Sequence, residues 1–592
     1  MSELNRNLQT TINVQKQANL IWNVADILRG LYKPHEYGKV ILPMTVIKRL
    51  HDTLMPTREA VLKASEQCKD MNDTMRNRML EKAAGYSFYN TSLYTFETLL
   101  ADPANIETNF RAYLNGFSDN MQDILANFKF DIEITNMAEN DALFYVIQEF
   151  NKKESYLGPD KVTSTDMGYV FEELVRKFSE SYNEEAGAHF TSRDVIYLMT
   201  DLLLAEDRET LTGQNVVKTV YDQTMGTSQM LSAMIERIHD FNKSAEVATF
   251  GQELNPETYA IAKADTMIRG GNPDNMALGS TLSNDRFEGY TFDYCISNPP
   301  FGIDWKKDKK SVEEEHQKGE NGRFGVGLPK INDGQLLFQL NGLSKLKETG
   351  RMAIVHNGSA LFSGNAGGGA IRQYVIENDW LEAIVQLPTD LFYNTGISTY
   401  VWILTKNKSA ARQGKVQLID ASKMFEKRRK NIGNKRVDIN EECRNMIVQA
   451  YGEFANKEYY VDDKVVESKV FDNLDFGYVK VTVESPQRDE EGNIILKKGK
   501  PVADTSLRDT EDIPLKEDVQ TYFEHEVLPF NPHAWMDRKK DKIGYEIPFT
   551  RLFYKYTAPE PSEVIAERIK KLEESIVANF QALSGKDVSN VD

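Results

Sequence analysis

The sequence predicts an α/β protein whose centre is a doubly wound, Rossmann-like domain. We expect a helical domain before it and a mixed C-terminal region that ends in a helix. From about residue 165 to 410, short apolar runs alternate with helical patterns, as they do in βαβ units. The chain before this stretch has few strand-like alternations, and the chain after it is mixed and charged. We therefore expect domains at residues 1–160, 161–425 and 426–592.

Two segments of the N-terminal part have the apolar spacing of amphipathic helices. The first covers Ile21–Leu28 and the second covers Ile41–Leu50. Pro43 fits the first turn of the second helix, where the missing N–H of proline costs no hydrogen bond.

Six apolar runs in the central part are strand candidates, and each of the first four ends at a polar or Gly/Pro-rich turn. Ligands of open parallel sheets bind at the carboxyl ends of the strands, so the residues after these runs are the ones to inspect. The runs are Val216–Tyr221, Val247–Gly251, Phe292–Ser297, Arg351–Val355, Ala383–Leu387 and Thr399–Leu404.

Composition limits the possible classes of function. No run of about 18 apolar residues is present, and Met1–Gln15 lacks the apolar stretch of a secretory signal. Cys68, Cys295 and Cys443 are far apart, so we expect no disulfides, no metal and a cytoplasmic location. The net charge of −18 argues against a chain that coats nucleic acid by itself, because phosphate binding draws on Lys and Arg.

Asn298-Pro299-Pro300-Phe301 directly follows the run that ends at Ser297. The prolines fix φ and would hold the Asn298 side-chain oxygen and the Pro299 carbonyl in place. Two acceptors aimed at the N–H bonds of an aromatic amine would stabilise the positive charge that develops when the amine attacks. Phe301 offers a face for a base to stack on, and a base must flip out of a duplex to reach such a pocket. A rigid turn capped by Asn298 is the alternative interpretation.

This turn resembles the catalytic motif of methyltransferases that act on adenine N6. Residues 10–410 look like the modification (M) subunit of a type I restriction-modification system. The resemblance implies a methyltransferase domain, S-adenosyl-L-methionine as cofactor, and catalytic roles for Asn298, Pro299, Pro300 and Phe301.

Four further stretches carry the resemblance, and the first is Gly187-Ala188-His189-Phe190-Thr191-Ser192. The family has Gly-x-x-Phe/Tyr-Thr-Pro here, packed against the methionine part of the cofactor, and Ser192 stands in the usual place of proline. The resemblance implies that Gly187, His189, Phe190 and Thr191 bind the cofactor.

The second stretch is a strand-to-helix turn, for which the family pattern is Asp-Pro-x-x-Gly-x-Gly-Gly. Glycine lets the backbone approach a ligand, and a helix N-terminus supplies donors. The sequence keeps Asp222 and Gly226 but has Ser228 and Gln229 where glycine is usual. The cofactor contacts implied here are Asp222, Gly226, Thr227, Ser228 and Gln229.

The other two stretches follow the next strands. Glu253 ends the second strand and can accept hydrogen bonds from both ribose hydroxyls. In Leu278–Asn284 the family often has Gly-Asp-Ser/Thr-Leu, with the Asp near the cofactor adenine. Ser280 replaces that Asp, so no role is transferred to it.

Several charged segments have two interpretations. Asp304–Gln335 either folds over a flipped base or is a solvated loop. Lys427–Lys430, with Lys435 and Arg436, either contacts phosphate or forms a solvated helix face.

The C-terminal region contains two further predicted elements. Ser485–Thr510 predicts a small polar hairpin with turns at Glu491-Gly492-Asn493 and Lys498-Gly499-Lys500. A terminal helix carries an apolar stripe that either packs on its own domain or docks on a partner: Ile565, Ile569, Leu572, Ile576, Phe580 and Leu583.

The resemblance also implies partners. These are double-stranded DNA with the adenine flipped out, a specificity (S) subunit, a second M subunit on the same S subunit, and a restriction (R) subunit able to join. Two alternatives stay open. The altered cofactor turn also fits a catalytically weakened, M-like subunit that binds or senses DNA, and Asn-Pro-Pro-aromatic also serves amino-methyltransferases that act on RNA or protein.

Overall fold

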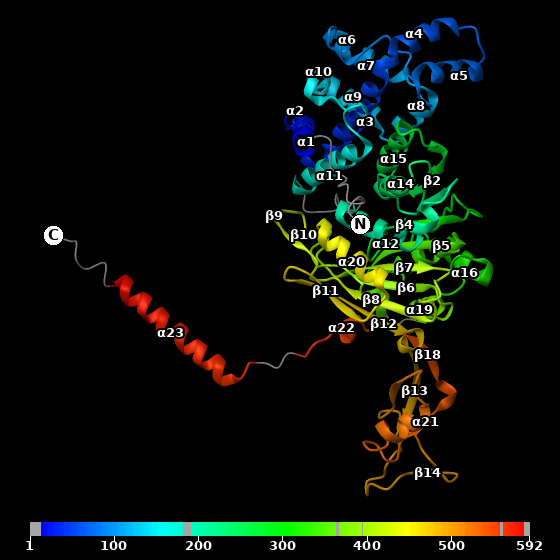
Figure 1. Cartoon of the computed structure of the whole chain (residues 1–592), viewed down its shortest axis with the longest axis vertical. Coiled ribbons are helices and arrows are strands. Elements are labelled where there is room, and N and C mark those ends of the chain that lie inside the picture. The colour runs from blue at the N-terminus through cyan, green and yellow to red at the C-terminus, as the bar shows by residue number, and fades with distance from the viewer. Residues whose placement is uncertain (1–12, 182–190, 363–365, 394, 557–559, 585–592) are drawn as a thin grey trace, which may run out of the picture. The chain divides into compact units, whose positions relative to one another are not determined.

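The computed structural model describes residues 13–181, 191–362, 366–393, 395–556 and 560–584. The chain forms two compact units, Met1–Ile547 and Pro548–Asp592. The first unit holds a helical part, a large mixed sheet and a small four-stranded sheet (Figure 1). The described part of the second unit contains helices and no strand.

The predicted N-terminal helical domain is confirmed. Its buried side chains form one apolar core with those of α11 (Ser164–Ser181), and Ala260, Ala264 and Met267 of α15 (Pro256–Ile268) belong to the same core. The helical part therefore packs directly against a helix of the sheet-containing part. The helices before α11 are α1 (Val14–Trp22), α2 (Val24–Leu28), α3 (Gly38–Leu54), α4 (Arg58–Gln67), α5 (Asp73–Ala84), α6 (Phe96–Leu100), α7 (Ile106–Asn115), α8 (Asp119–Ala126), α9 (Phe130–Glu139) and α10 (Leu143–Phe150).

The position predicted for Pro43 is wrong. Helix α3 begins at Gly38, so Pro43 lies inside the helix and not in its first turn. An interior proline costs about 3 kcal/mol or more. Burying a Val or Ile side chain contributes about 1.5–3 kcal/mol, and both Val40 and Ile41 are fully buried in the turn before Pro43. Tertiary packing therefore extends the helix past the proline.

The predicted doubly wound sheet is confirmed, and its strand order is β11-β12-β8-β6-β7-β5-β4-β1-β2-β3. β1 pairs in parallel with β2 on one side and β4 on the other, whereas β7 is antiparallel to β5 and β6. The six predicted strands lie in this sheet as β1, β2, β4, β5, β6 and β7. The strands are β1 (Val217–Asp222), β2 (Glu246–Glu253), β3 (Met276–Leu278), β4 (Phe292–Ser297), β5 (Leu346–Asn357), β6 (Leu381–Gln386), β7 (Thr399–Thr405), β8 (Lys415–Asp420), β11 (Lys457–Val461) and β12 (Lys464–Asp472).

Helices cover both faces of this sheet. Successive residues of a strand point to opposite faces, so the neighbours of successive β4 side chains show what packs on each face. Tyr294 and Ile296 of β4 share a core with side chains of α12, α14 and α20. Cys295 lies between them in the sequence and points to the other face, where it packs on α17. A Cβ added to Gly342 of α17 would be 3.2 Å from the Cys295 sulfur. The helices in this part of the chain, besides α15, are α12 (Arg193–Leu204), α13 (Arg208–Leu211), α14 (Gln229–Phe241), α16 (Lys309–Gln317), α17 (Gln335–Ser344), α18 (Ser359–Phe362), α19 (Ala366–Glu377) and α20 (Glu441–Glu453).

The sheet continues beyond residue 425, where we placed the end of the central domain. β12 pairs antiparallel with β8, and β11 pairs with β12. Ile447, Ala450 and Tyr451 of α20 belong to the same core as the central strands. The sequence does not predict this extension, because the chain beyond residue 410 is mixed and charged and lacks the apolar runs of the central strands.

The basic cluster of residues 427–436 is a β-hairpin, so its interpretation as a helix face is wrong. β9 (Glu426–Ile432) pairs antiparallel with β10 (Lys435–Asp438). The segment 304–335 is partly helical, because it contains α16.

A small sheet follows the large one. β13 (Gly477–Glu484) pairs with β16 (Asp509–Pro514), β17 (Trp535–Met536) and β18 (Lys542–Tyr545). α21 (Val519–Tyr522) lies between β16 and β17 in the chain. The predicted polar hairpin is confirmed: β14 (Leu496–Lys497) and β15 (Lys500–Pro501) pair across Lys498 and Gly499, both of which have positive φ.

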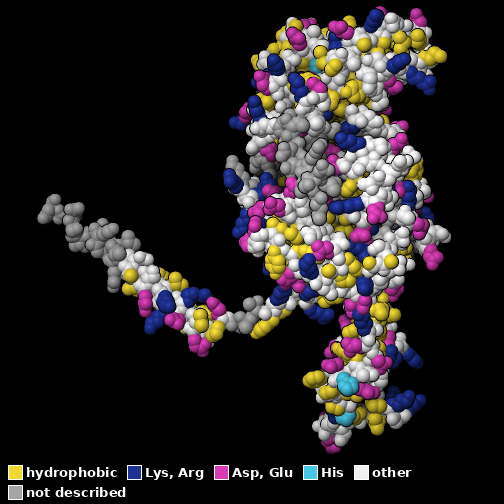
Figure 2. All heavy atoms as spheres, viewed as in Figure 1, with side chains coloured by type: hydrophobic (Ala, Val, Ile, Leu, Met, Phe, Trp, Pro, Cys, Tyr) yellow, Lys and Arg dark blue, Asp and Glu magenta, His cyan; other side chains and the backbone are white. Residues whose placement is uncertain are grey.

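The second unit contains α22 (Phe549–Leu552) and α23 (Ser562–Ser584), so the predicted terminal helix is confirmed. Ile569, Leu572, Ile576 and Phe580 are more than half exposed on α23. Among the described residues, no helix is long and apolar enough to cross a membrane. Acidic and basic side chains are interspersed over most of the face seen in Figure 2.

Candidate functional site

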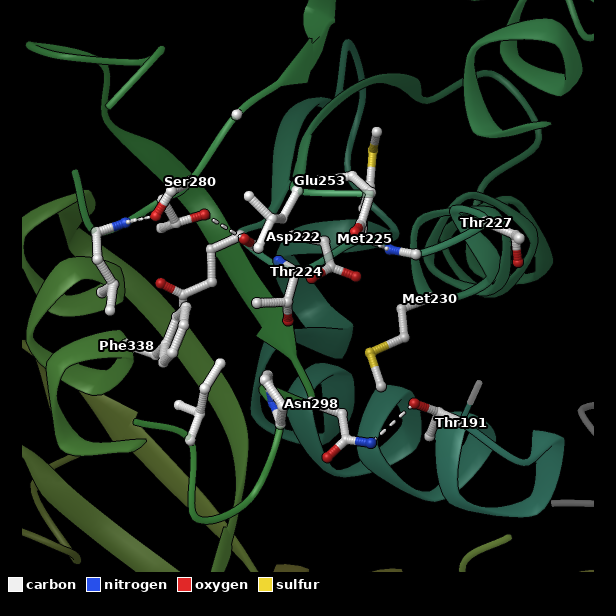
Figure 3. A pocket seen from close by; sticks show the side chains of 18 of the residues that line it. Thr191, Asp222, Thr224, Met225, Thr227, Met230, Glu253, Ser280, Asn298 and Phe338 are labelled. Carbon is white, nitrogen blue, oxygen red and sulfur yellow. Dashed lines mark hydrogen bonds between the residues drawn. The ribbon is translucent and has the colours of Figure 1, made fainter. Parts of the chain in front are cut away.

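One pocket lies at the carboxyl ends of β1, β2, β3 and β4, where the strand order reverses at β1. Ligand sites of open α/β sheets are expected at such a point. In Figure 3, Ser280 and Thr227 lie at opposite ends of the pocket, with Asp222 and Glu253 between them. Eight of the predicted site residues line the pocket: Thr191, Asp222, Gly226, Thr227, Gln229, Glu253, Asn298 and Pro300.

Asn298 is held with its side-chain oxygen free. The Asn298 Nδ2 donates a hydrogen bond to Thr191 Oγ1 (2.9 Å), which fixes the orientation of the amide (Figure 3). Asn298 Oδ1 is buried and has no hydrogen-bond partner among the described residues. A buried acceptor without a partner costs about 1–3 kcal/mol, so this oxygen is poised to accept a hydrogen bond from a ligand.

Phe301 and Pro299 belong to the same turn but do not line the pocket. The Phe301 ring meets the edge of the Phe392 ring, with 5.7 Å between centroids and an interplanar angle of 85°. Phe301 is half-buried and packs against the sheet core, which fixes the orientation of its ring. The turn is therefore anchored on both sides, at Thr191 and at Phe392.

Asp222 ends β1 and faces the pocket while almost fully buried. The pKa of its carboxyl is raised to about 8, mainly by burial; the hydrogen bond from the Thr224 N–H (3.0 Å) lowers this pKa, and the nearby Glu253 carboxylate raises it. A cationic group beside Asp222 would favour its ionised form.

The turn after Asp222 keeps the backbone of a glycine-rich loop although two glycines are replaced. Gly226 has φ 53° and Ser228 has φ 69°, both in the left-handed region. The Ser228 hydroxyl is buried without a hydrogen-bond partner among the described residues. Ser228 does not line the pocket, so its predicted contact with the cofactor stays a prediction. Gln229 does line the pocket, and its side-chain oxygen accepts a hydrogen bond from the Arg193 guanidinium.

Glu253 is clamped at the end of β2. Its Oε2 accepts a hydrogen bond from the Gly226 N–H (2.9 Å), and its Oε1 accepts one from the Asn255 N–H (2.8 Å). Each carboxylate oxygen has a further lone pair, so Glu253 can still accept two hydrogen bonds from a ligand.

Ser280 is hydrogen-bonded to a carboxylate that the sequence reasoning missed. Ser280 Oγ donates to Asp308 Oδ1 (2.8 Å), and the Ser283 hydroxyl donates to the same oxygen. Both Ser280 and Asp308 line the pocket. Asp308, 28 residues further along the chain, therefore lies beside Ser280, the position at which the family often has an aspartate.

Two other side chains that line the pocket, those of Trp305 and Gln223, were not predicted from the sequence. Trp305 lies three residues before Asp308 and lines the pocket, and its indole N–H donates a hydrogen bond to the Lys330 carbonyl (2.9 Å). Gln223 occupies the proline position of the family pattern. Its amide bonds the Ser297 hydroxyl (3.0 Å) and accepts from Asn341 (2.7 Å), so it joins the ends of β1 and β4 to α17. Trp305 and Asp308 lie in the segment 304–335 that follows the catalytic turn, and the only signal for Gln223 in the sequence is its departure from the proline of the family pattern.

Three of the predicted cofactor-binding residues, Gly187, His189 and Phe190, lie outside the described residues. Within the described ranges, no group of His, Cys, Asp and Glu side chains could hold a metal ion.

The strand order, the antiparallel β7 and the pocket at the ends of β1, β2 and β4 define a Rossmann-like methyltransferase domain. The family models for N-6 DNA Methylase and for the HsdM N-terminal domain match residues 163–488 and 17–150. The chain belongs to the N-6 DNA methylase family, as a methylase (M) subunit of the type I restriction-modification kind.

Curated relatives agree with this assignment. The type I restriction enzyme MjaIX methylase subunit of Methanocaldococcus jannaschii is 24% identical over 467 residues, which cover 76% of this chain and 79% of the relative. The MpnII methylase subunit of Mycoplasma pneumoniae is 24% identical over 465 residues, which cover 69% and 80%. The type I methyltransferase subunit of Streptococcus thermophilus shares the fold, with a TM-score of 0.60 at 23% identity, over 78% of this chain and 96% of that one.

Proposed function

We propose that this chain transfers a methyl group from S-adenosyl-L-methionine to adenine N6 in DNA, at sites chosen by a separate specificity subunit. The observation that carries the proposal is Asn298, which lines a pocket at the reversal point of the sheet and whose buried side-chain oxygen has no hydrogen-bond partner among the described residues. Its geometry suits an acceptor for an amine N–H.

The residues of the pocket fit this cofactor. Glu253 can accept both ribose hydroxyls, and Asp308 can accept a hydrogen bond from the adenine amine of the cofactor. Leu254, Leu282 and Phe338 line the pocket with apolar surface for a purine ring. The Asp222 carboxyl and the N-terminus of α14, beside Thr227, would interact with the charged methionine part.

S-adenosyl-L-methionine supplies an electrophilic methyl group on a sulfonium when it is bound. The protein has to hold the target amine in line with that methyl. Asn298 Oδ1 and the Pro299 carbonyl would accept the two N–H bonds of the adenine amine and stabilise the positive charge that develops on its nitrogen. The Phe301 ring, braced by Phe392, would stack on the flipped base.

The proposed assembly has two of these chains on one specificity subunit, and a restriction subunit can join it. The net charge of −18 supports this division of labour, because target recognition then rests on another polypeptide. The exposed apolar stripe of α23, with Ile569, Leu572 and Ile576, supports docking on a partner helix.

The test uses the full chain together with its proposed specificity subunit. DNA is incubated with S-adenosylmethionine that carries a labelled methyl group and is digested to nucleosides, and we expect the label in N6-methyladenine. No labelled N6-methyladenine would refute the proposal. Label in RNA or protein would favour the other amine substrates, and failure to bind the cofactor would favour a subunit that only senses DNA.

The variant Asn298→Ala tests the role of the catalytic turn independently of cofactor binding. We expect this variant to lose methyl transfer and to keep its affinity for S-adenosylhomocysteine nearly unchanged, measured by calorimetry. Glu313→Gln, on exposed α16 outside the pocket, is the control and should keep both properties. Transfer at the wild-type rate by Asn298→Ala would show that the catalytic centre is elsewhere.

A further inference from the structure

The β9–β10 hairpin is a basic projection on an acidic chain. Residues 426–438 contain six Lys and Arg residues and two acidic residues, whereas the whole chain has a net charge of −18. Lys427, Arg429 and Arg436 are exposed. Figure 2 shows Lys and Arg side chains at the edge of the molecule where Figure 1 labels β9.

The charges of the hairpin divide into two groups. Lys435 is buried and pairs with Asp194 (2.9 Å) and Asp438 (3.2 Å), and Arg428 pairs with Asp438. Lys427, Arg429 and Arg436 form no ion pair among the described residues. Three cations therefore remain available to a ligand, while the paired ones fix the hairpin in place.

The buried Lys435 ammonium ties the hairpin to both segments that hold the catalytic turn. It bonds Asp194 Oδ2 in the first turn of α12, and it donates to the Leu391 carbonyl (3.0 Å). Thr191, three residues before Asp194, bonds Asn298 (2.9 Å). Phe392, next to Leu391, contacts the Phe301 ring.

Backbone hydrogen bonds reinforce this attachment. The Arg436 N–H donates to the Asp390 carbonyl (2.8 Å), and the Asn434 N–H donates to the Tyr393 carbonyl (2.9 Å). The segment around Phe392 is thus held between the hairpin and the catalytic turn. The hairpin is therefore held in a fixed position near the proposed binding site of the target base.

We propose that Lys427, Arg429 and Arg436 bind the phosphates of the DNA strand next to the flipped adenine. This inference rests on the proposed function and assigns a contact surface to it. Flipping a base rotates its sugar-phosphate backbone, so the phosphates on either side of the base must lie near the catalytic turn. Cations on a hairpin anchored to that turn would hold the strand in register without reading its sequence.

The test compares two triple variants that remove the same charge from two exposed hairpins. The first is Lys427→Gln, Arg429→Gln and Arg436→Gln, and the control is Lys497→Gln, Lys498→Gln and Lys500→Gln on the β14–β15 hairpin. The full chain, saturated with S-adenosylhomocysteine, is titrated into a fluorescein-labelled duplex with one mispaired adenine. Fluorescence anisotropy gives the affinity at a series of NaCl concentrations.

We expect the plot of log affinity against log salt to lose about two to three units of slope in the first variant, at about 0.9 per phosphate contact. The control should keep the wild-type slope, and both variants should keep their affinity for S-adenosylhomocysteine. Equal slopes in all three proteins, equal losses in both variants, or no binding by the wild type would overturn the proposal. Loss of assembly with the specificity protein at unchanged slope would overturn it too, by making the hairpin a protein contact. None of these results depends on N6-methyladenine formation, which tests the proposed function separately.

Discussion

Ser228→Gly is expected to stabilise the sheet-containing part of the protein, because Ser228 carries two local costs. Its φ of 69° lies in the left-handed region, which costs a residue with a Cβ about 1–2 kcal/mol. Its hydroxyl is buried without a partner among the described residues, which costs about 1–3 kcal/mol. Glycine removes both costs and adds about 0.5–1 kcal/mol of backbone entropy.

The lower ends of the two gains, set against the upper end of the loss, still leave about 1 kcal/mol in favour of glycine. We expect a net gain of about 1–2 kcal/mol. Ser228→Ala separates the two contributions, because it removes the hydroxyl and keeps the strained Cβ. Gly226→Ala, at φ 53°, should shift stability in the opposite direction and serves as the control.

Hydrogen exchange measured by mass spectrometry suits this test, because a chain with several domains has no single unfolding free energy. Peptides from β1, β4 and α14 should exchange about tenfold more slowly in Ser228→Gly, since about 1.4 kcal/mol corresponds to a factor of ten. Faster exchange in Ser228→Gly would contradict the reasoning. Equal gains in Ser228→Ala and Ser228→Gly would show that the backbone is not strained.

Three further predictions concern carboxylates. Asp308→Ala should weaken the binding of S-adenosylhomocysteine about 10–100-fold in calorimetry, because a charge-assisted hydrogen bond is lost. The same variant should bind the 6-oxo analogue S-inosylhomocysteine with unchanged affinity. Equal weakening of both ligands would show that Asp308 does not contact the purine. Glu382→Gln should lower the stability of the large sheet by about 3–5 kcal/mol, measured by hydrogen exchange of peptides from β5 and β6, because the buried Arg351 guanidinium loses its ion-pair partner, whereas Arg412 keeps its ion pair with Glu206; a loss below 1 kcal/mol would contradict this. The native Asp222 keeps its proton up to about pH 8, whereas the unfolded chain releases it near pH 4, so stability should fall as pH rises between these values, by at most about 1.4 kcal/mol per unit. Asp222→Asn should flatten that fall in melting curves from pH 5 to 8, and identical pH profiles would show that Asp222 ionises normally.

The central strands could be predicted because they are buried on both faces. The run Phe292–Ser297 is buried at every position except Asp293, and the turn that follows it lies at the edge of the sheet where ligands bind. β12 was missed because it carries Lys464, Glu467 and Lys469, which place it outside the apolar pattern of the central strands. Its pairing with β8 depends on tertiary contacts that the pattern does not contain.

The polar contacts of the pocket were beyond prediction for a different reason. Asp308 meets Ser280 only because the segment after the catalytic turn folds back over the end of β3. Gln223 joins β1, β4 and α17 through side chains that are far apart in the sequence. Spacing identifies residues on one element, whereas these contacts join several elements.

Three of the departures from the family pattern on the cofactor side, at Ser228, Gln229 and Ser280, differ in their consequences. Gln229 stands where glycine is usual, but its side chain accepts a hydrogen bond from Arg193. Ser280 stands where aspartate is usual, but it bonds Asp308, so a carboxylate remains at that end of the pocket. Only Ser228 combines a strained backbone with a buried hydroxyl that has no partner among the described residues. Because Ser228 does not line the pocket, its cost should fall on the stability of the turn, and we expect cofactor affinity to depend on Glu253 and Asp308 instead.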